Sequence, residues 1–97
     1  MLRIQLYGKE GCAKCASTRE KLNHLLGKWQ VADQVELGFF DMGTEEGMTE
    51  GAFNDVDEVP TTLLMDDSGT ELARWEARIP PSDAVRRHLA DAGIVQA

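Results

Sequence analysis

The 97-residue sequence is poor in several features, and each shortage argues against a class of protein. No apolar run approaches the ~20 residues of a membrane-spanning helix, so we expect no contact with a membrane. Lysine and arginine are absent between Asp41 and Glu71. Phosphate binding needs clustered basic side chains, so this distribution argues against nucleic acid as a partner. Two cysteines and two histidines also leave the chain without an obvious four-ligand metal site.

The rest of the composition is that of an ordinary globular protein, with 42% hydrophobic and 28% charged residues. We expect one domain over residues 1–97 and a monomer. The first residues enter a strand pattern at once, without a signal peptide, which favours a cytoplasmic protein. The net charge of −7 is concentrated between Asp41 and Glu71. This acidic stretch serves solubility, or it selects a basic partner or repels acidic ones.

Two cysteines at C-x-x-C spacing form the most informative feature of the sequence. The alternating residues of Leu2–Tyr7 predict a strand, Gly8–Gly11 a tight loop, and the spacing from Cys12 onward a helix. Cys12 would therefore lie at the start of a helix, where free N–H groups and the helix dipole favour a thiolate. We predict a dithiol/disulfide exchange site in which Cys12 attacks a substrate disulfide and Cys15 resolves the product.

Periodicity and turn residues predict the remaining elements. The first helix ends at Trp29, a weak second helix begins after Thr44, and Asp66–Gly69 forms a hairpin turn. The element order is β-α-β-α-β-β-α, which predicts an α/β fold with a four-stranded mixed sheet and helices on both faces. The predicted ranges are 2–7, 35–41, 61–65 and 70–76 for strands, and 12–29, 45–54 and 82–93 for helices.

The pattern also predicts how individual side chains pack. Arg3 and Gln5 do not suit a covered central strand, so we expect them near the edge or rim of the sheet. Both histidines are expected to be structural or surface residues rather than metal ligands. Among the apolar residues, Ala16 is expected on the buried face of the first helix, and Ala52, Phe53 and Val56 are expected against the sheet.

Two segments resemble the glutaredoxin-like proteins of the thioredoxin fold. Tyr7–Cys15 looks like their Tyr-x-Lys-x-x-Cys-x-x-Cys pattern, and Val59-Pro60-Thr61 looks like their Val-Pro turn. The resemblance implies a thioredoxin-like fold, a cis peptide before Pro60, and substrate contacts from Lys9, Val59 and Pro60. Lys14, within the motif, is expected to help lower the pKa of the Cys12 thiol.

The same resemblance implies a redox-active Cys12–Cys15 disulfide and no tightly bound cofactor. Lys9 matches the family lysine that pairs with glutathione, but Ala73–Ala77 lacks the glycine pair of glutathione-binding members. We therefore expect an electron carrier to protein disulfides, reset by thioredoxin reductase or by the glutathione system. Two alternatives remain: a metal or iron–sulfur carrier using both thiols, and a redox-inert interaction domain.

Overall fold

The computed structural model describes residues 1–96, and its elements follow the predicted β-α-β-α-β-β-α order. The predicted element bounds differ from the observed ones by at most two residues. The strands are β1 (Leu2–Gly8), β2 (Val35–Asp41), β3 (Thr61–Met65) and β4 (Glu71–Glu76), and the helices are α1 (Ala13–Lys28), α2 (Glu45–Phe53) and α3 (Ser82–Asp91).

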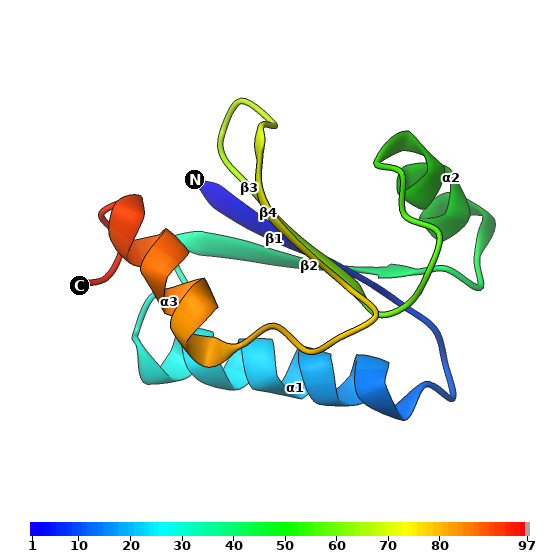
Figure 1. Cartoon of the computed structure of the whole chain (residues 1–97), viewed down its shortest axis with the longest axis horizontal. Helices are drawn as coiled ribbons and strands as arrows, with labels where there is room; N and C mark the ends of the chain where they lie inside the picture. Colours follow the sequence, from blue (N-terminus) through cyan, green and yellow to red (C-terminus); the bar gives the residue numbers. More distant parts are fainter. Residues whose placement is uncertain (97) are drawn as a thin grey trace.

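The four strands form one mixed sheet in the order β2-β1-β3-β4. β1 is parallel to β2 and antiparallel to β3, and β3 and β4 form the predicted hairpin. Figure 1 shows α1 and α3 on one face of the sheet and α2 on the other. The predicted fold class, a four-stranded mixed sheet with helices on both faces, is therefore confirmed.

The placement of Arg3 and Gln5 at a sheet edge was wrong, because β1 is a central strand. Both side chains are nevertheless half-buried rather than buried. They alternate with residues of the α1 face and so project to the α2 face, whose small apolar cluster gathers around Tyr7 at the far end of β1. The short helix α2 leaves the beginning of β1 less covered on this face (Figure 1).

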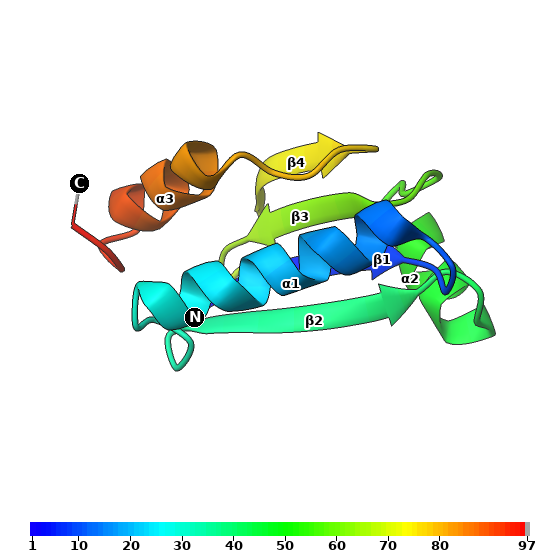
Figure 2. The same cartoon turned by 90° about the horizontal axis from the view of Figure 1, so that it is seen from below.

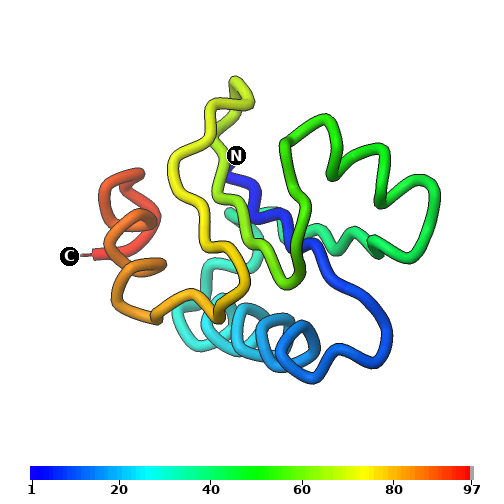
Figure 3. The backbone as a smooth tube through the Cα atoms, turned by 45° about the vertical axis from the view of Figure 1, so that its right-hand side comes forward, coloured from blue at the N-terminus to red at the C-terminus, as the bar shows by residue number. Residues whose placement is uncertain are grey.

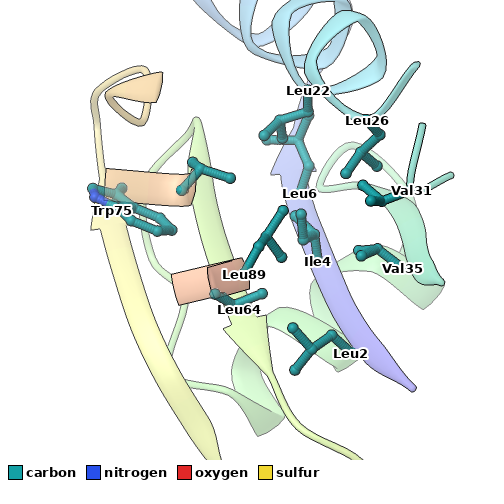
Figure 4. Packing of buried hydrophobic residues seen from close by; sticks show 11 residues of the cluster. Leu2, Ile4, Leu6, Leu22, Leu26, Val31, Val35, Leu64, Trp75 and Leu89 are labelled. Carbon is teal, nitrogen blue, oxygen red and sulfur yellow. The ribbon is translucent and has the colours of Figure 1, made fainter. Parts of the chain in front are cut away.

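The main core lies between the sheet and the helices α1 and α3 (Figure 4). In α1 the buried positions follow the steps of three and four residues expected of one helical face. Ala16 was wrongly assigned to this face, since the stripe begins at Cys15 and Thr18 and leaves Ala16 exposed. The buried residues of this cluster are Leu2, Ile4, Leu6, Leu22, Leu26, Val31, Val35, Leu64, Trp75, Val85 and Leu89.

Helix α2 packs through its glycines. The Thr44 side chain caps the helix as predicted, accepting a hydrogen bond from the Gly47 amide. Gly47 and Gly51 are the buried positions of this helix. The helix approaches the end of β2 so closely that a Cβ at Gly47 would collide with the backbone of Asp41. The prediction that Ala52 and Phe53 face the sheet was wrong: both are exposed, and Phe53 is 83% exposed.

Two further sequence predictions, for Val56 and for the histidines, agree with the structure. Val56 is buried against Tyr7 and Leu63 on the α2 face of the sheet. His24 is exposed on α1, and His88 packs edge-on against the Trp75 ring. Within residues 1–96, no helix has the length and apolar character needed to cross a membrane.

Candidate functional site

The two cysteines lie where β1 passes into α1, and they form a disulfide. Cys12 is the N-cap residue of α1, with an extended backbone at φ −96° and ψ 104°. Its Sγ accepts a hydrogen bond from the Cys15 amide at 3.1 Å. The first turn of α1 contains no acidic residue, so no carboxylate there would place negative charge beside the Cys12 sulfur. A Cys12 thiolate would therefore meet a backbone donor and the positive end of the helix dipole.

The two sulfur-bearing side chains differ in their exposure. Cys12 is partly exposed, whereas Cys15 is only 2% exposed and belongs to the buried face of α1. An external disulfide can therefore approach Cys12, while Cys15 lies behind it with little exposure to solvent. This asymmetry is the arrangement that a nucleophilic and a resolving thiol require.

Gly8 makes room for Cys15, which sequence analysis did not anticipate. The sequence placed Gly8 in a loop, whereas the structure makes it the last residue of β1. A Cβ at this position would lie 3.0 Å from the Cys15 Cβ and 3.1 Å from the Phe39 ring. A side chain at this position would therefore have to push Cys15 or the Phe39 ring aside by a few tenths of an ångström. The one available signal was a glycine directly after an alternating strand pattern.

The peptide bond between Val59 and Pro60 is cis, as predicted. The last paired residues of β1 and β3 are Tyr7 and Thr61, so the next step along each strand brings Gly8 opposite Pro60. Because Cys15 packs on Gly8, the buried Pro60 lies on the same side of the molecule as the cysteine pair. Figures 2 and 3 likewise show the chain entering β3 beside the first turn of α1.

A chain of hydrogen bonds links the motif to the segment after β4. The Lys14 ammonium group donates to the Ala77 carbonyl at 3.4 Å, and the Ala77 amide donates to the Pro60 carbonyl at 2.8 Å. Ala77 adopts a left-handed backbone, with φ at 57°. This non-glycine residue in a sparsely populated conformation was not anticipated from the sequence. Its amide is already occupied by Pro60 and is not free to bind a ligand.

A cavity of about 440 Å³ opens beside the disulfide, on the β2 side of α1. Both cysteines and Lys9 line it, so the structure brings these three predicted site residues together. Val59 and Pro60 are not among its lining residues. The Arg19 guanidinium lies over the Phe39 ring in its wall, 4.6 Å from the ring centre, which the sequence pattern could not indicate.

Three exposed carboxylates, from Asp57, Glu58 and Glu76, come within 4.8 Å of one another. Two of them directly precede Val59, so negative charge borders the segment expected to bind substrate.

Throughout residues 1–96, neither histidine joins the two cysteines in a group of three potential metal ligands.

Comparison with known proteins supports the fold. The sequence matches no protein-family model and no curated protein. Solved structures are similar: thioredoxin 1 of the thermophilic eubacterium Thermosipho africanus superposes with a TM-score of 0.74 at 18% identity, over 94% of this chain and 98% of that one. Thioredoxin-2 of the malaria parasite gives a TM-score of 0.77 at 16% identity, over 94% and 82% of the two chains.

Thioredoxin O2 of Arabidopsis thaliana, in its oxidized state, gives a TM-score of 0.73 at 13% identity, over 94% of this chain and 74% of that one. Such low identities establish the fold and leave the glutaredoxin-like subgroup a prediction. The chain therefore has a thioredoxin-like fold with a Cys12–Cys15 disulfide at the start of its first helix.

Proposed function

We propose that the protein is a thiol-disulfide oxidoreductase that carries electrons to protein disulfides. The observation that carries this proposal is the asymmetry of the pair: Cys12 is accessible at the N-cap of α1, and Cys15 is buried behind it. A passive structural disulfide would have no need for a sulfur at a helix N-terminus, where a thiolate is stabilised.

The reaction begins with the reduced protein. The Cys12 thiolate attacks one sulfur of the substrate disulfide, the substrate S–S bond breaks, and the other substrate sulfur leaves as a thiolate and takes a proton from water. The Cys15 thiol then loses its proton to water and attacks Cys12 Sγ. The mixed disulfide breaks, the second substrate thiolate is released and protonated, and the protein is left with its Cys12–Cys15 disulfide. Two electrons pass from protein to substrate.

The neighbouring residues have proposed roles in substrate binding and thiolate stabilisation. The Val59 backbone would pair with an extended substrate segment, packed against Pro60. Lys9 lines the cavity beside the disulfide and would contact the substrate there. Lys14 would lower the pKa of the Cys12 thiol, although its ammonium group is directed to the Ala77 carbonyl.

The partners follow from the same chemistry. The substrate is a protein disulfide, and the electron donor is thioredoxin reductase in preference to glutathione. Negative charge from Asp57, Glu58 and Glu76 borders Val59 and would repel glutathione, which is an anionic tripeptide. We propose a monomer in the cytoplasm, a compartment in which thiols are kept reduced.

Reduction of insulin disulfides tests the function directly. The wild-type protein should reduce insulin with NADPH and thioredoxin reductase, and more slowly with glutathione and glutathione reductase. Cys12→Ser should abolish turnover, and Cys15→Ser should accumulate a mixed disulfide with insulin that mass spectrometry detects. A wild-type protein inactive with both donors, or two fully active variants, would contradict the proposal. Inactivity together with bound metal or colour would favour the carrier alternative.

A further inference from the structure

The Thr62 hydroxyl is buried without a hydrogen-bond partner. Thr62 is fully buried, and within residues 1–96 its Oγ1 is the one buried side-chain oxygen or nitrogen that lacks a partner. The other two fully buried threonines are satisfied: Thr18 donates to the Lys14 carbonyl and Thr61 to the Glu58 carbonyl, each at 2.8 Å. An unsatisfied buried hydroxyl is unfavourable and calls for a physical explanation.

The strand register places Thr62 in the apolar layer beneath α1. Thr62 pairs with Leu6 of β1 on one side and with Trp75 of β4 on the other. Both neighbours belong to the main core, and Figure 4 shows their side chains among those packed on this face of the sheet. A valine would satisfy this environment without leaving a polar group unpaired. Local packing therefore gives no reason for the hydroxyl.

The nearby polar group that can change its chemical state is the sulfur of Cys15. Gly8 lies two residues beyond Leu6 on the same face of β1 and is thus the diagonal cross-strand neighbour of Thr62, at roughly 7–8 Å. Cys15 packs directly on Gly8, within 3.2 Å of where its Cβ would be. The Thr62 hydroxyl and the Cys15 sulfur thus share one buried layer, together with Gly8 and the buried Pro60.

We propose that Thr62 donates a hydrogen bond to the Cys15 sulfur when the Cys12–Cys15 pair is reduced. In the disulfide, Cys15 Sγ is bonded to Cys12 and the hydroxyl has no partner. Reduction releases the Cys15 sulfur from Cys12, so that its side chain can turn toward the hydroxyl and accept from it, weakly as a thiol and much more strongly as a thiolate. The bond therefore stabilises the dithiol over the disulfide, and it favours the Cys15 thiolate that resolves the mixed disulfide.

The inference concerns the resolving half of the proposed function, but its test does not depend on finding a substrate. The equilibrium between the full-length protein and a dithiothreitol redox buffer measures the stability of the Cys12–Cys15 disulfide by itself. Thr62→Val removes the hydroxyl, Thr62→Ser keeps it, and Thr61→Val removes a buried hydroxyl that already has a partner. Thr62→Ala removes the hydroxyl as well, should the valine variant not fold.

Thr62→Val should shift this equilibrium about three- to tenfold toward the disulfide, which is a potential more negative by about 15–30 mV. It should also slow the release of substrate from the mixed disulfide by a similar factor, without lowering the urea midpoint of the oxidised protein. Thr62→Ser and Thr61→Val should keep the wild-type equilibrium. An unchanged equilibrium in both Thr62→Val and Thr62→Ala would overturn the inference, whether or not wild type reduces insulin.

Discussion

The two faces of the sheet are held to their helices by different kinds of contact. On the face covered by α1 and α3, eleven buried residues form one continuous apolar cluster. On the α2 face the buried cluster is much smaller, comprising Tyr7, Val56, Leu63 and Met65. There the helix approaches through glycines, and hydrogen bonds from Asn54 and Arg74 hold the segment that follows it.

This difference predicts that the two faces differ in how readily they open. The Cys12–Cys15 pair is built on α1, whose packing buries a full helical face. The segment that leads from α2 to Pro60 has few apolar anchors and depends on polar contacts with β4. Stability in proteins is locally uneven, and regions with few buried apolar contacts open first. We therefore expect the α2 side to open more readily than α1, which holds the sulfur atoms.

The largest effects should come from the core, and β3 offers a matched pair. Leu63 and Leu64 are adjacent, each at most 1% exposed, and they project to the α2 face and the α1 face respectively. Leu64→Ala should lower the free energy of unfolding by about 3–4 kcal/mol and Leu63→Ala by about 2–3 kcal/mol, because the thinner layer can close around the cavity. Urea unfolding measures both, and an equal or reversed order would break the comparison of the two faces.

Glycine substitutions should separate the faces by the sign of their effect. Gly47→Ala should lower the free energy of unfolding by about 1–3 kcal/mol, because its Cβ would collide with the Asp41 backbone and push α2 off the sheet. Gly27→Ala is the matched control, since Gly27 is exposed on α1 with open space around it. It should raise the free energy of unfolding by about 0.5–1 kcal/mol. A neutral Gly47→Ala would mean that α2 is not held by close approach.

The same difference explains which parts of the fold were predictable. The core of the α1 face is encoded in local patterns: the alternation of Leu2, Ile4 and Leu6 and the helical spacing of Leu22 and Leu26. The bounds of β1 and α1 were therefore predicted to within two residues. The packing of α2 was not, because helix propensity treats its glycines as weak points. These glycines let α2 approach Asp41 and Met42 at the end of β2, a tertiary contact that helix propensity does not describe.

The candidate site divides in the same way. The spacing of Cys12 and Cys15 is a local pattern that predicted the disulfide, whereas the cis peptide before Pro60 was predicted from the family resemblance. Tertiary contacts escaped sequence reasoning, including Gly8 against Cys15 and the left-handed Ala77, whose amide binds the Pro60 carbonyl. The first depends on how α1 packs on β1 and the second on the pairing of β3 with β4, and neither is encoded in the local pattern.

The polar anchor of the α2 side should have a smaller effect than its apolar or glycine contacts. Arg74 donates to the backbone carbonyls of Asn54 and Asp55 at 2.6 and 3.1 Å, and its hydrogen bond with Glu71 raises the pKa of its guanidinium. Arg74→Met should lower the free energy of unfolding by about 1 kcal/mol, since these groups remain near solvent. It should also speed amide hydrogen exchange between residues 54 and 58.

Arg86→Met is the control for that variant, because Arg86 is a cation on the α3 side whose guanidinium lies over the Trp29 ring. It should leave hydrogen exchange in residues 54–58 unchanged. Equal exchange rates in the two variants would show that Arg74 does not hold the segment that leads to Pro60.

The smallest predicted effect is a pH dependence confined to the α2 face. Burial raises the pKa of the Tyr7 hydroxyl above its ordinary value of 10.0, although a hydrogen bond from Asn54 acts in the opposite direction. A raised pKa in the folded state means that Tyr7 favours folding below pH 10 and that this contribution fades as the pH rises through the folded-state pKa. Unfolding free energy should therefore fall by at most about 1 kcal/mol between pH 10 and 11 through Tyr7. Tyr7→Phe should remove this part of the slope, whereas a slope identical to wild type would assign the alkaline sensitivity to groups outside the α2 face.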